Sequence, residues 1–186
     1  GGLSTTQIKG IGTTQLAALT ATDIGEFQSA QIAIFATTQL TALGGNFAAL
    51  DAGQLAVLST TQMAALTGTN VAAVTATQIG LLADTQLAAL SSTRIGALVP
   101  TSFSALDATA VAGLTTTQIR GVTATQLAGL TATDIGEFLE TQIAIFSGTQ
   151  LAALGANAAA LADTQISVLS SSQIGSLTAT NLGALT

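Results

Sequence analysis

Large apolar residues recur along this chain at an interval of eight residues. In the stretch TTTQIRGVTATQLAGL (residues 115–130), two copies of the unit T-x-T-Q-[I/L]-x-x-L follow one another. We name the Gln position the anchor of its unit. The residue after the anchor is large and apolar in 22 of 23 units, Ala158 being the exception, and the residue four after the anchor is apolar in every unit. The pattern therefore indicates an array of octapeptide repeats.

The anchors are eight residues apart except at two places, where the spacing is seven and ends at Asn46 and at Asn157. These two short units are 111 residues apart in the chain. A shift of 111 residues also superimposes residues 1–75 on residues 112–186, whereas residues 76–111 occur once. The sequence predicts one continuous repeat array over residues 1–186, with a complete 111-residue super-repeat (1–111) and a partial second one (112–186). The anchors are Gln7, Gln15, Asp23, Gln31, Gln39, Asn46, Gln54, Gln62, Asn70, Gln78, Gln86, Arg94, Ser102, Ala110, Gln118, Gln126, Asp134, Gln142, Gln150, Asn157, Gln165, Gln173 and Asn181.

The spacing within a unit favours a helix. The two large apolar residues, for example Ile119 and Val122, are three apart, which places them on one face of a helix but on opposite faces of a strand. Many units also carry T-x-x-Q or T-x-x-D, the capping-box signature at N-cap and N3. Pro100 falls at N1 in this frame, where proline is best tolerated. We therefore predict one helix of about seven residues, roughly 10 Å long, in each unit. The N-caps include Thr20, Ser59, Thr67, Thr75, Thr123 and Thr131.

Helices this short are not stable alone in water, so each must bury its apolar pair against its neighbours. The predicted fold class is all-α: a solenoid of short capped helices around a continuous core, with Thr and Gln turned toward corners and solvent. The two seven-residue units are expected to change the pitch or phase of the coil. The alternative is a β-solenoid, because Thr, Ile and Val favour strands. Its weakness is that strand alternation would turn one member of each apolar pair outward.

The composition excludes most chemistry. The chain has no His, Cys, Trp or Tyr, which removes the usual general bases, thiol nucleophiles and transition-metal ligands. We therefore expect no enzyme, no catalytic residue, no cofactor and no metal. Only Lys9, Arg94 and Arg120 oppose nine acids, giving a net charge of −6 and no basic patch for nucleic acid. Thr, Gln and Ser interrupt the apolar residues well before ~18 in a row, so we predict no transmembrane segment.

Two pairs of acids have helical i, i+3 spacing: Asp23 with Glu26, and Asp134 with Glu137, to which Glu140 adds a third carboxylate. Hard cations take oxygen ligands, so a weak calcium site is one interpretation. We favour the other, in which both aspartates occupy N3 of a helix and complete its capping box.

Two further motifs have alternative interpretations. Seven T-x-T tripeptides precede an anchor; they form either an ice-binding array, if they line one flat side, or helix caps, which we favour. Four phenylalanines replace the second apolar residue in consecutive units of both super-repeats and indicate a wider core, the alternative being an exposed aromatic patch. The tripeptides begin at Thr20, Thr67, Thr75, Thr115, Thr123, Thr131 and Thr178, and the phenylalanines are Phe27, Phe35, Phe138 and Phe146.

Units such as TATQLAGLTATDIG (123–136) and TTQLAALTATDIG (13–25) resemble the A-L-T-T-x-Q-[I/L] octad arrays of very long, low-charge surface or secreted proteins of Gram-negative bacteria, described as adhesin-like. The resemblance covers the whole chain and implies a stalk or fibre rather than a site. It also implies an extracellular or cell-surface location, and we expect the chain to be a piece of a longer array.

These observations predict a structural repeat protein: a segment of an extracellular fibre, stalk or surface layer that self-associates. The alternative function is a binding module, with a glycan, a protein or ice on a face rich in Thr and Gln. If the super-repeat spans a whole number of coil turns, TDIGEF at 22–27 and 133–138 recurs on one side of the rod and offers regularly spaced contacts to identical neighbours.

Overall fold

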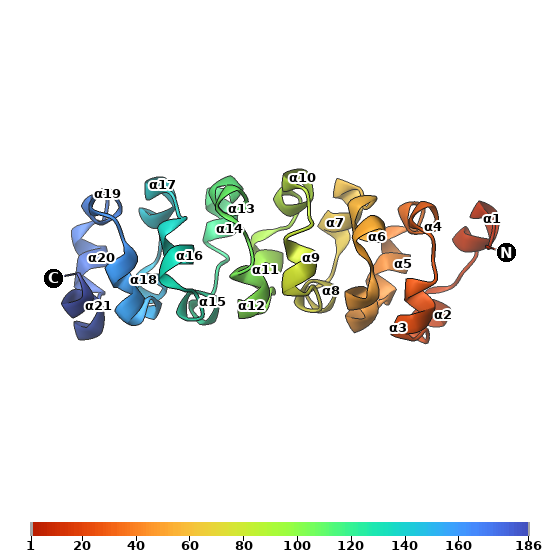
Figure 1. The fold of residues 1–186 in the computed structure, drawn as a ribbon, viewed down its shortest axis with the longest axis horizontal. Coiled ribbons are helices and arrows are strands. Elements are labelled where there is room, and N and C mark those ends of the chain that lie inside the picture. The colour runs from red at the N-terminus through yellow and green to blue at the C-terminus, as the bar shows by residue number, and fades with distance from the viewer. Residues whose placement is uncertain (1, 186) are drawn as a thin grey trace.

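The protein is a straight rod of short helices with its two ends at opposite tips (Figure 1). The structure is a computed structural model and describes residues 2–185. Over this range the chain forms 21 α-helices and two 3-10 helices, and no strand. The all-α solenoid is confirmed, and the β-solenoid alternative is wrong. None of the helices in this range is long and apolar enough to cross a membrane.

The helices follow the octapeptides one for one. In the first super-repeat they are α1 (Thr5–Lys9), α2 (Thr13–Ala17), α3 (Ala21–Gly25), α4 (Ser29–Ala33), α5 (Thr37–Ala42), η1 (Gly44–Ala49), α6 (Ala52–Ala56), α7 (Thr60–Ala65), α8 (Gly68–Ala72), α9 (Ala76–Ile79), α10 (Asp84–Ala88), α11 (Ser92–Ile95), α12 (Pro100–Phe103) and α13 (Ala108–Gly113). In the second they are α14 (Thr116–Ile119), α15 (Ala124–Ala128), α16 (Ala132–Gly136), α17 (Glu140–Ile143), α18 (Gly148–Ala153), η2 (Gly155–Ala160), α19 (Asp163–Ser167), α20 (Ser171–Gly175) and α21 (Ala179–Ala184).

The six residues named as N-caps in the sequence analysis each accept a hydrogen bond from the backbone N–H three residues later, as predicted. In α15, the Thr123 hydroxyl accepts a hydrogen bond from the Gln126 backbone N–H, and the Gln126 side chain accepts one from the Thr123 backbone N–H at 2.8 Å. Pro100 stands at N1 of α12 as predicted. The helices are shorter than predicted, four to six residues rather than seven. They stop early because the second apolar residue can turn extended, as Leu114 does at ψ 126°.

The apolar pairs meet in one continuous core. Ile119, Val122, Leu127 and Leu130 are at most 4% exposed, as their spacing predicts. Phe138 and Phe146 are buried and pack edge to face with their ring centroids 5.3 Å apart. The equivalent rings of the first super-repeat make the same contact at 5.3 Å. Phe35 is likewise buried and Phe27 packs against the core, so the phenylalanines are core residues and not an exposed aromatic patch.

The anchor side chains are where our prediction was wrong. We expected Gln to face corners and solvent, but Gln118 and Gln126 are only 3% and 1% exposed. The capping bond holds the side-chain oxygen next to the start of its own helix, and this directs the NH₂ group toward the preceding turn of the coil. Most of the Thr caps do lie at exposed corners, as predicted.

Hydrogen bonds between turns give the size of the coil. Side chains at the anchors donate to carbonyl oxygens 26 to 31 residues earlier, and the commonest separation is 28 residues. This separation equals 3.5 octapeptides, and four such turns come within one residue of the length of the 111-residue super-repeat. Equivalent helices of the two super-repeats accordingly return to the same edge of the rod: α4 and α17 lie along the upper edge, and α2 and α15 along the lower edge (Figure 1).

The two seven-residue units form the 3-10 helices η1 and η2. Each begins with a glycine at positive φ, Gly44 at 53° and Gly155 at 55°, so that the preceding α-helix runs on without the usual extended corner. Among residues 2–185 these are the only positive-φ positions. In both seven-residue units a left-handed glycine thus takes the place of the extended corner.

Candidate functional site

The most regular polar feature is a set of buried amides that joins successive turns. The NH₂ group of Gln126 donates to the carbonyl oxygens of both Ile95 and Leu98, each at 2.8 Å. The oxygen of the same amide accepts from the Thr123 N–H at 2.8 Å and from the Thr123 hydroxyl at 3.0 Å. One side chain thus caps its own helix and satisfies two carbonyl groups of the turn before. We call the anchor side chains with such bonds the amide ladder.

The amide ladder continues through most of the rod and changes where the anchor changes. Asn157 donates to Leu130, Arg94 donates to Leu66, and the Ser102 hydroxyl donates to Val74. Asp134 has no proton to donate, and the bond is reversed, with the Ser104 hydroxyl donating to Asp134 Oδ2 at 2.6 Å. Ala110 has no polar side chain and leaves a gap. The ladder uses its polar groups for structure and offers no reactive group.

The T-x-T tripeptides act as caps at their first position. The first Thr of all seven is an N-cap whose side chain accepts from the anchor N–H. The second Thr is exposed in each case. A Thr occupies this second position in 18 of the 23 units, so exposed hydroxyl groups surround the rod rather than line one side.

The predicted carboxylate pairs have different surroundings in the two super-repeats. Asp23 accepts from the Thr20 hydroxyl at 2.7 Å and from the Thr20 N–H at 2.8 Å, and these bonds lower the pKa of Asp23. It stands at N3 of α3, as Asp134 does in α16, so the capping interpretation is confirmed for both. Glu26 points to solvent.

Glu137 lies in a less favourable place. Its Oε2 atom is buried without a hydrogen-bond partner. Burial, and then the negative charges of Asp134 and Asp107, raise the pKa of Glu137. The spacing of residues along the chain does not predict the effect of Asp107, because whether it lies near Glu137 depends on the number of units in a turn of the coil. Within residues 2–185, no group of three acidic, His or Cys side chains is arranged to hold a metal ion.

The nine acids are carried by helices that follow one another along the rod, and these helices are not confined to one side of it, since α3 lies at the lower edge of Figure 1 and α10 at the upper edge. Ladder bonds from Gln54 to Phe27 and from Gln86 to Leu55 link helices of this row from one turn to the next. Other helices of the row are linked by packing, and Asp107 is near enough to Glu137 to affect its pKa. We call this row the acidic strip; it comprises α3, α4, α6, α9, α10, α13, α16, α17 and α19. Five of these helices, α4, α10, α13, α17 and α19, run along the upper edge in Figure 1. The acids are Asp23, Glu26, Asp51, Asp84, Asp107, Asp134, Glu137, Glu140 and Asp163.

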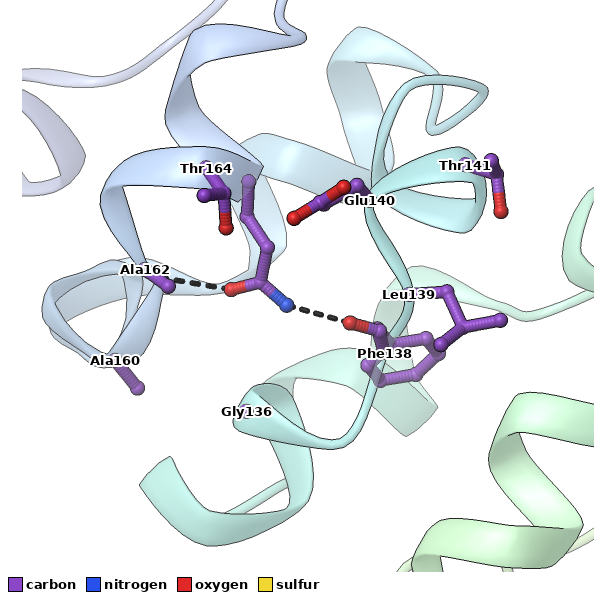
Figure 2. Close-up of a pocket in the computed structure, with 9 residues that line it drawn as sticks. Gly136, Phe138, Leu139, Glu140, Thr141, Ala160, Ala162 and Thr164 are labelled. Atoms are coloured by element: carbon purple, nitrogen blue, oxygen red, sulfur yellow. Dashed lines mark hydrogen bonds between the residues drawn. The ribbon is translucent and has the colours of Figure 1, made fainter.

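Three clefts lie along the acidic strip. One, of about 470 Å³, opens between α17 and α19 and is lined by Phe138, Leu139, Glu140, Thr141 and Thr164 among others. Figure 2 shows it with the two ladder bonds of Gln165, to Ala162 and to Phe138. A second cleft, of about 220 Å³, separates α10 from α13, and a third, of about 310 Å³, lies beside α3.

Residues that differ between the super-repeats line the cleft between α17 and α19. At the equivalent point of the first super-repeat, Gly53 lets α6 approach α4 so closely that a Cβ atom on it would lie 3.1 Å from Ser29 Oγ. Thr164 and Glu140 replace Gly53 and Ser29 in the second super-repeat, and both line the cleft between α17 and α19. Leu139, in the place of Gln28, is 46% exposed beside the opening.

Comparisons with protein-family models, with curated proteins and with solved structures gave no match to this chain. Its function is therefore argued from its own geometry and from the resemblance of its octads.

Proposed function

We propose that this chain is a structural repeat protein, a segment of an extracellular fibre, stalk or surface layer. The observation that carries the proposal is the amide ladder. Each turn of the coil is joined to the next by the same kind of buried hydrogen bond, so the array lengthens by adding turns without changing its cross-section. A rod that grows in this way separates its two ends by a distance that depends on the number of repeats.

The side chains support a mechanical rather than a chemical role. The chain has no His, Cys, Trp or Tyr. Apart from Glu137, its buried polar side chains are occupied in caps and in the ladder, which leaves no paired nucleophile and base. We infer that it is not an enzyme. We propose an extracellular or cell-surface location for the protein because its octads resemble those of Gram-negative surface proteins.

Adding repeats tests the proposal. We compare the 186-residue chain with a longer chain in which residues 1–111 occur twice before residue 112, which keeps the phase of the repeat. Four added turns, each about 8–10 Å thick at helix packing distances, should lengthen the particle by roughly 30–40 Å. Small-angle X-ray scattering measures the maximum dimension and the cross-section. An unchanged cross-section with the longer dimension supports a rod; a particle that grows in all directions, as globular domains do, contradicts the proposal.

A second candidate is a binding module, favoured by the clefts of the acidic strip. The opening beside Leu139 has an apolar wall and adjacent polar groups from Glu140 and Thr164, the mixture that small ligands use. Glycan-array binding of the intact chain tests this function, and a thermal-hysteresis measurement tests for ice. Binding that survives Leu139→Gln, which restores the residue of the first super-repeat, would place the ligand elsewhere.

A further inference from the structure

The amide ladder is weakest at three consecutive anchors, Arg94, Ser102 and Ala110. Arg94 and Ser102 each donate one hydrogen bond to a carbonyl oxygen of the preceding turn, and Ala110 has no side-chain donor. The next anchor, Gln118, makes two such bonds by itself. Nowhere else in the sequence do two neighbouring anchors both lack an amide. We call the joint between the three helices of these anchors, α11, α12 and α13, and the preceding helices α7 to α10 the seam.

Packing at the seam is also incomplete opposite Ala110. From Phe35 to Leu161, the residue four after the anchor is at most 6% exposed in every unit except that of Leu82. Leu82 is only partly buried, and the adjacent Leu81 is 48% exposed. The cleft of about 220 Å³ between α10 and α13 opens beside Ala110 at the same joint. The seam therefore lacks side-chain contacts as well as hydrogen bonds.

The joint on the other side of α11 to α13 is closer. Gln126 and Gln142 each donate at least two hydrogen bonds to carbonyl oxygens of this turn. The backbones also touch there, since a Cβ atom on Gly96 would lie 2.5 Å from the carbonyl oxygen of Gly121. Across the seam, a Cβ atom on Gly68 would have its nearest neighbour at 3.9 Å, an ordinary contact distance. The turn of α11 to α13 is thus held more firmly by the turn that follows it than by the turn before it.

A rod built of repeats opens first at its weakest joint, because its stability is the sum of its units and of the contacts between neighbours. We propose that the rod opens first at the seam, while the turns on either side of it stay folded. The inference rests on the proposed structural function and gives the stalk or fibre a set place to yield under tension. The three anchors of the seam lie within residues 76–111, the part of the super-repeat that occurs once in this chain. A longer array of super-repeats would accordingly have one seam in every four turns.

The two ends of the rod show which side chain reports an open joint. In the first turn, Ile8 and Leu16 are 0% exposed, although the described part of the chain has no turn before them. In the last turn, Ile174 and Leu182 hold the same position after the anchor and are 38% and 45% exposed. The residue after the anchor is therefore covered by the turn that follows it. Val71 holds this position before the seam and is 1% exposed, so opening of the seam should expose it.

Thiol labelling tests the proposal, because the chain has no cysteine of its own. Val71→Cys places a thiol under the seam. Val111→Cys places one at the same position of its unit, 3% exposed, under the joint that Gln142 closes, and the two sites are about equally far from the nearest end of the rod. We expect methyl methanethiosulfonate to label the Val71→Cys variant faster than the Val111→Cys variant by about tenfold or more. Equal rates, or faster labelling of the Val111→Cys variant, would overturn the proposal.

Exchanging anchors in the same assay tests whether the ladder causes the difference. Ser102→Gln in the Val71→Cys variant should slow its labelling, and Gln142→Ser in the Val111→Cys variant should speed its labelling, each by about fivefold. A rate that Gln142→Ser leaves unchanged would contradict the ladder as the origin of the seam. If the two thiols label equally while the lengthened chain still scatters as a longer rod, the seam fails and the structural function stands.

Discussion

The side-chain amide of Gln126 lies 2.8 Å from the carbonyl oxygen of Leu98, a residue 28 positions earlier in the chain. The two groups belong to successive turns, and both residues are nearly inaccessible to solvent. Buried hydrogen bonds are strong when complete and costly when broken. This contact, repeated along the rod, makes the stability of each turn depend on the turn before it.

Replacing Gln126 by Leu should therefore destabilise the rod. The substitution keeps the approximate volume but leaves the carbonyl groups of Ile95 and Leu98 and the N–H of Thr123 without their partner. We expect a loss of about 2–4 kcal/mol in the free energy of unfolding. Urea unfolding followed by circular dichroism measures it. Gln7→Leu is the control, because Gln7 is exposed and caps only its own helix; equal losses in both variants would assign the effect to capping alone.

Filling the gap in the ladder should have the opposite effect. Ala110 stands beside the cleft between α10 and α13, and the register places a Gln there opposite the carbonyl groups of Ile79 and Leu82. Two new bonds should make Ala110→Gln more stable by about 1–2 kcal/mol. Ala110→Leu fills the same space without an amide. If the Leu variant gains as much in the same urea titration, packing rather than hydrogen bonding stabilises this position.

The left-handed glycines give a prediction about the short units. Gly44 has φ 53°, a conformation that costs an L-residue about 1–2 kcal/mol, so Gly44→Ala should lose about that much stability. The adjacent Gly45 has no positive φ, and a Cβ atom added to it would meet no other atom within 4 Å, so Gly45→Ala should be neutral or stabilising. Thermal unfolding of the two variants separates backbone strain from the loss of glycine as such.

Much of the fold follows from spacing within one octapeptide. The i, i+3 pair of Ile119 and Val122, the cap at Thr115 and the N1 position of Pro100 are local features, and the sequence predicted all of them. The number of units in a turn depends on the angles of many corners added together. No single unit contains that information, and the electrostatic effect of Asp107 on Glu137 was unpredictable for this reason.

The inward direction of the anchors did leave a signal in the sequence. A capping box accepts Glu as readily as Gln at N3, yet none of the 23 anchors is Glu and 18 are Gln or Asn. Only an amide can accept at its oxygen and also donate from its nitrogen. The exclusion of Glu therefore indicates a second, donating contact, which capping alone does not require.

Glu137 gives a prediction that depends on pH. Burial, followed by the charges of Asp134 and Asp107, raises its pKa above the usual value of 4.5 in the folded protein. The folded state thus binds this proton more tightly than the unfolded state, and the resulting stabilisation, present below pH 4.5, is lost as the pH rises through the folded pKa. Glu137→Gln removes the charge, so its melting temperature should exceed that of the parent at pH 7 and match it near pH 3. Glu26→Gln, at the equivalent exposed position, is the matched control; the same gain there at pH 7 would mean that the overall charge of −6, and not the burial of Glu137, limits stability.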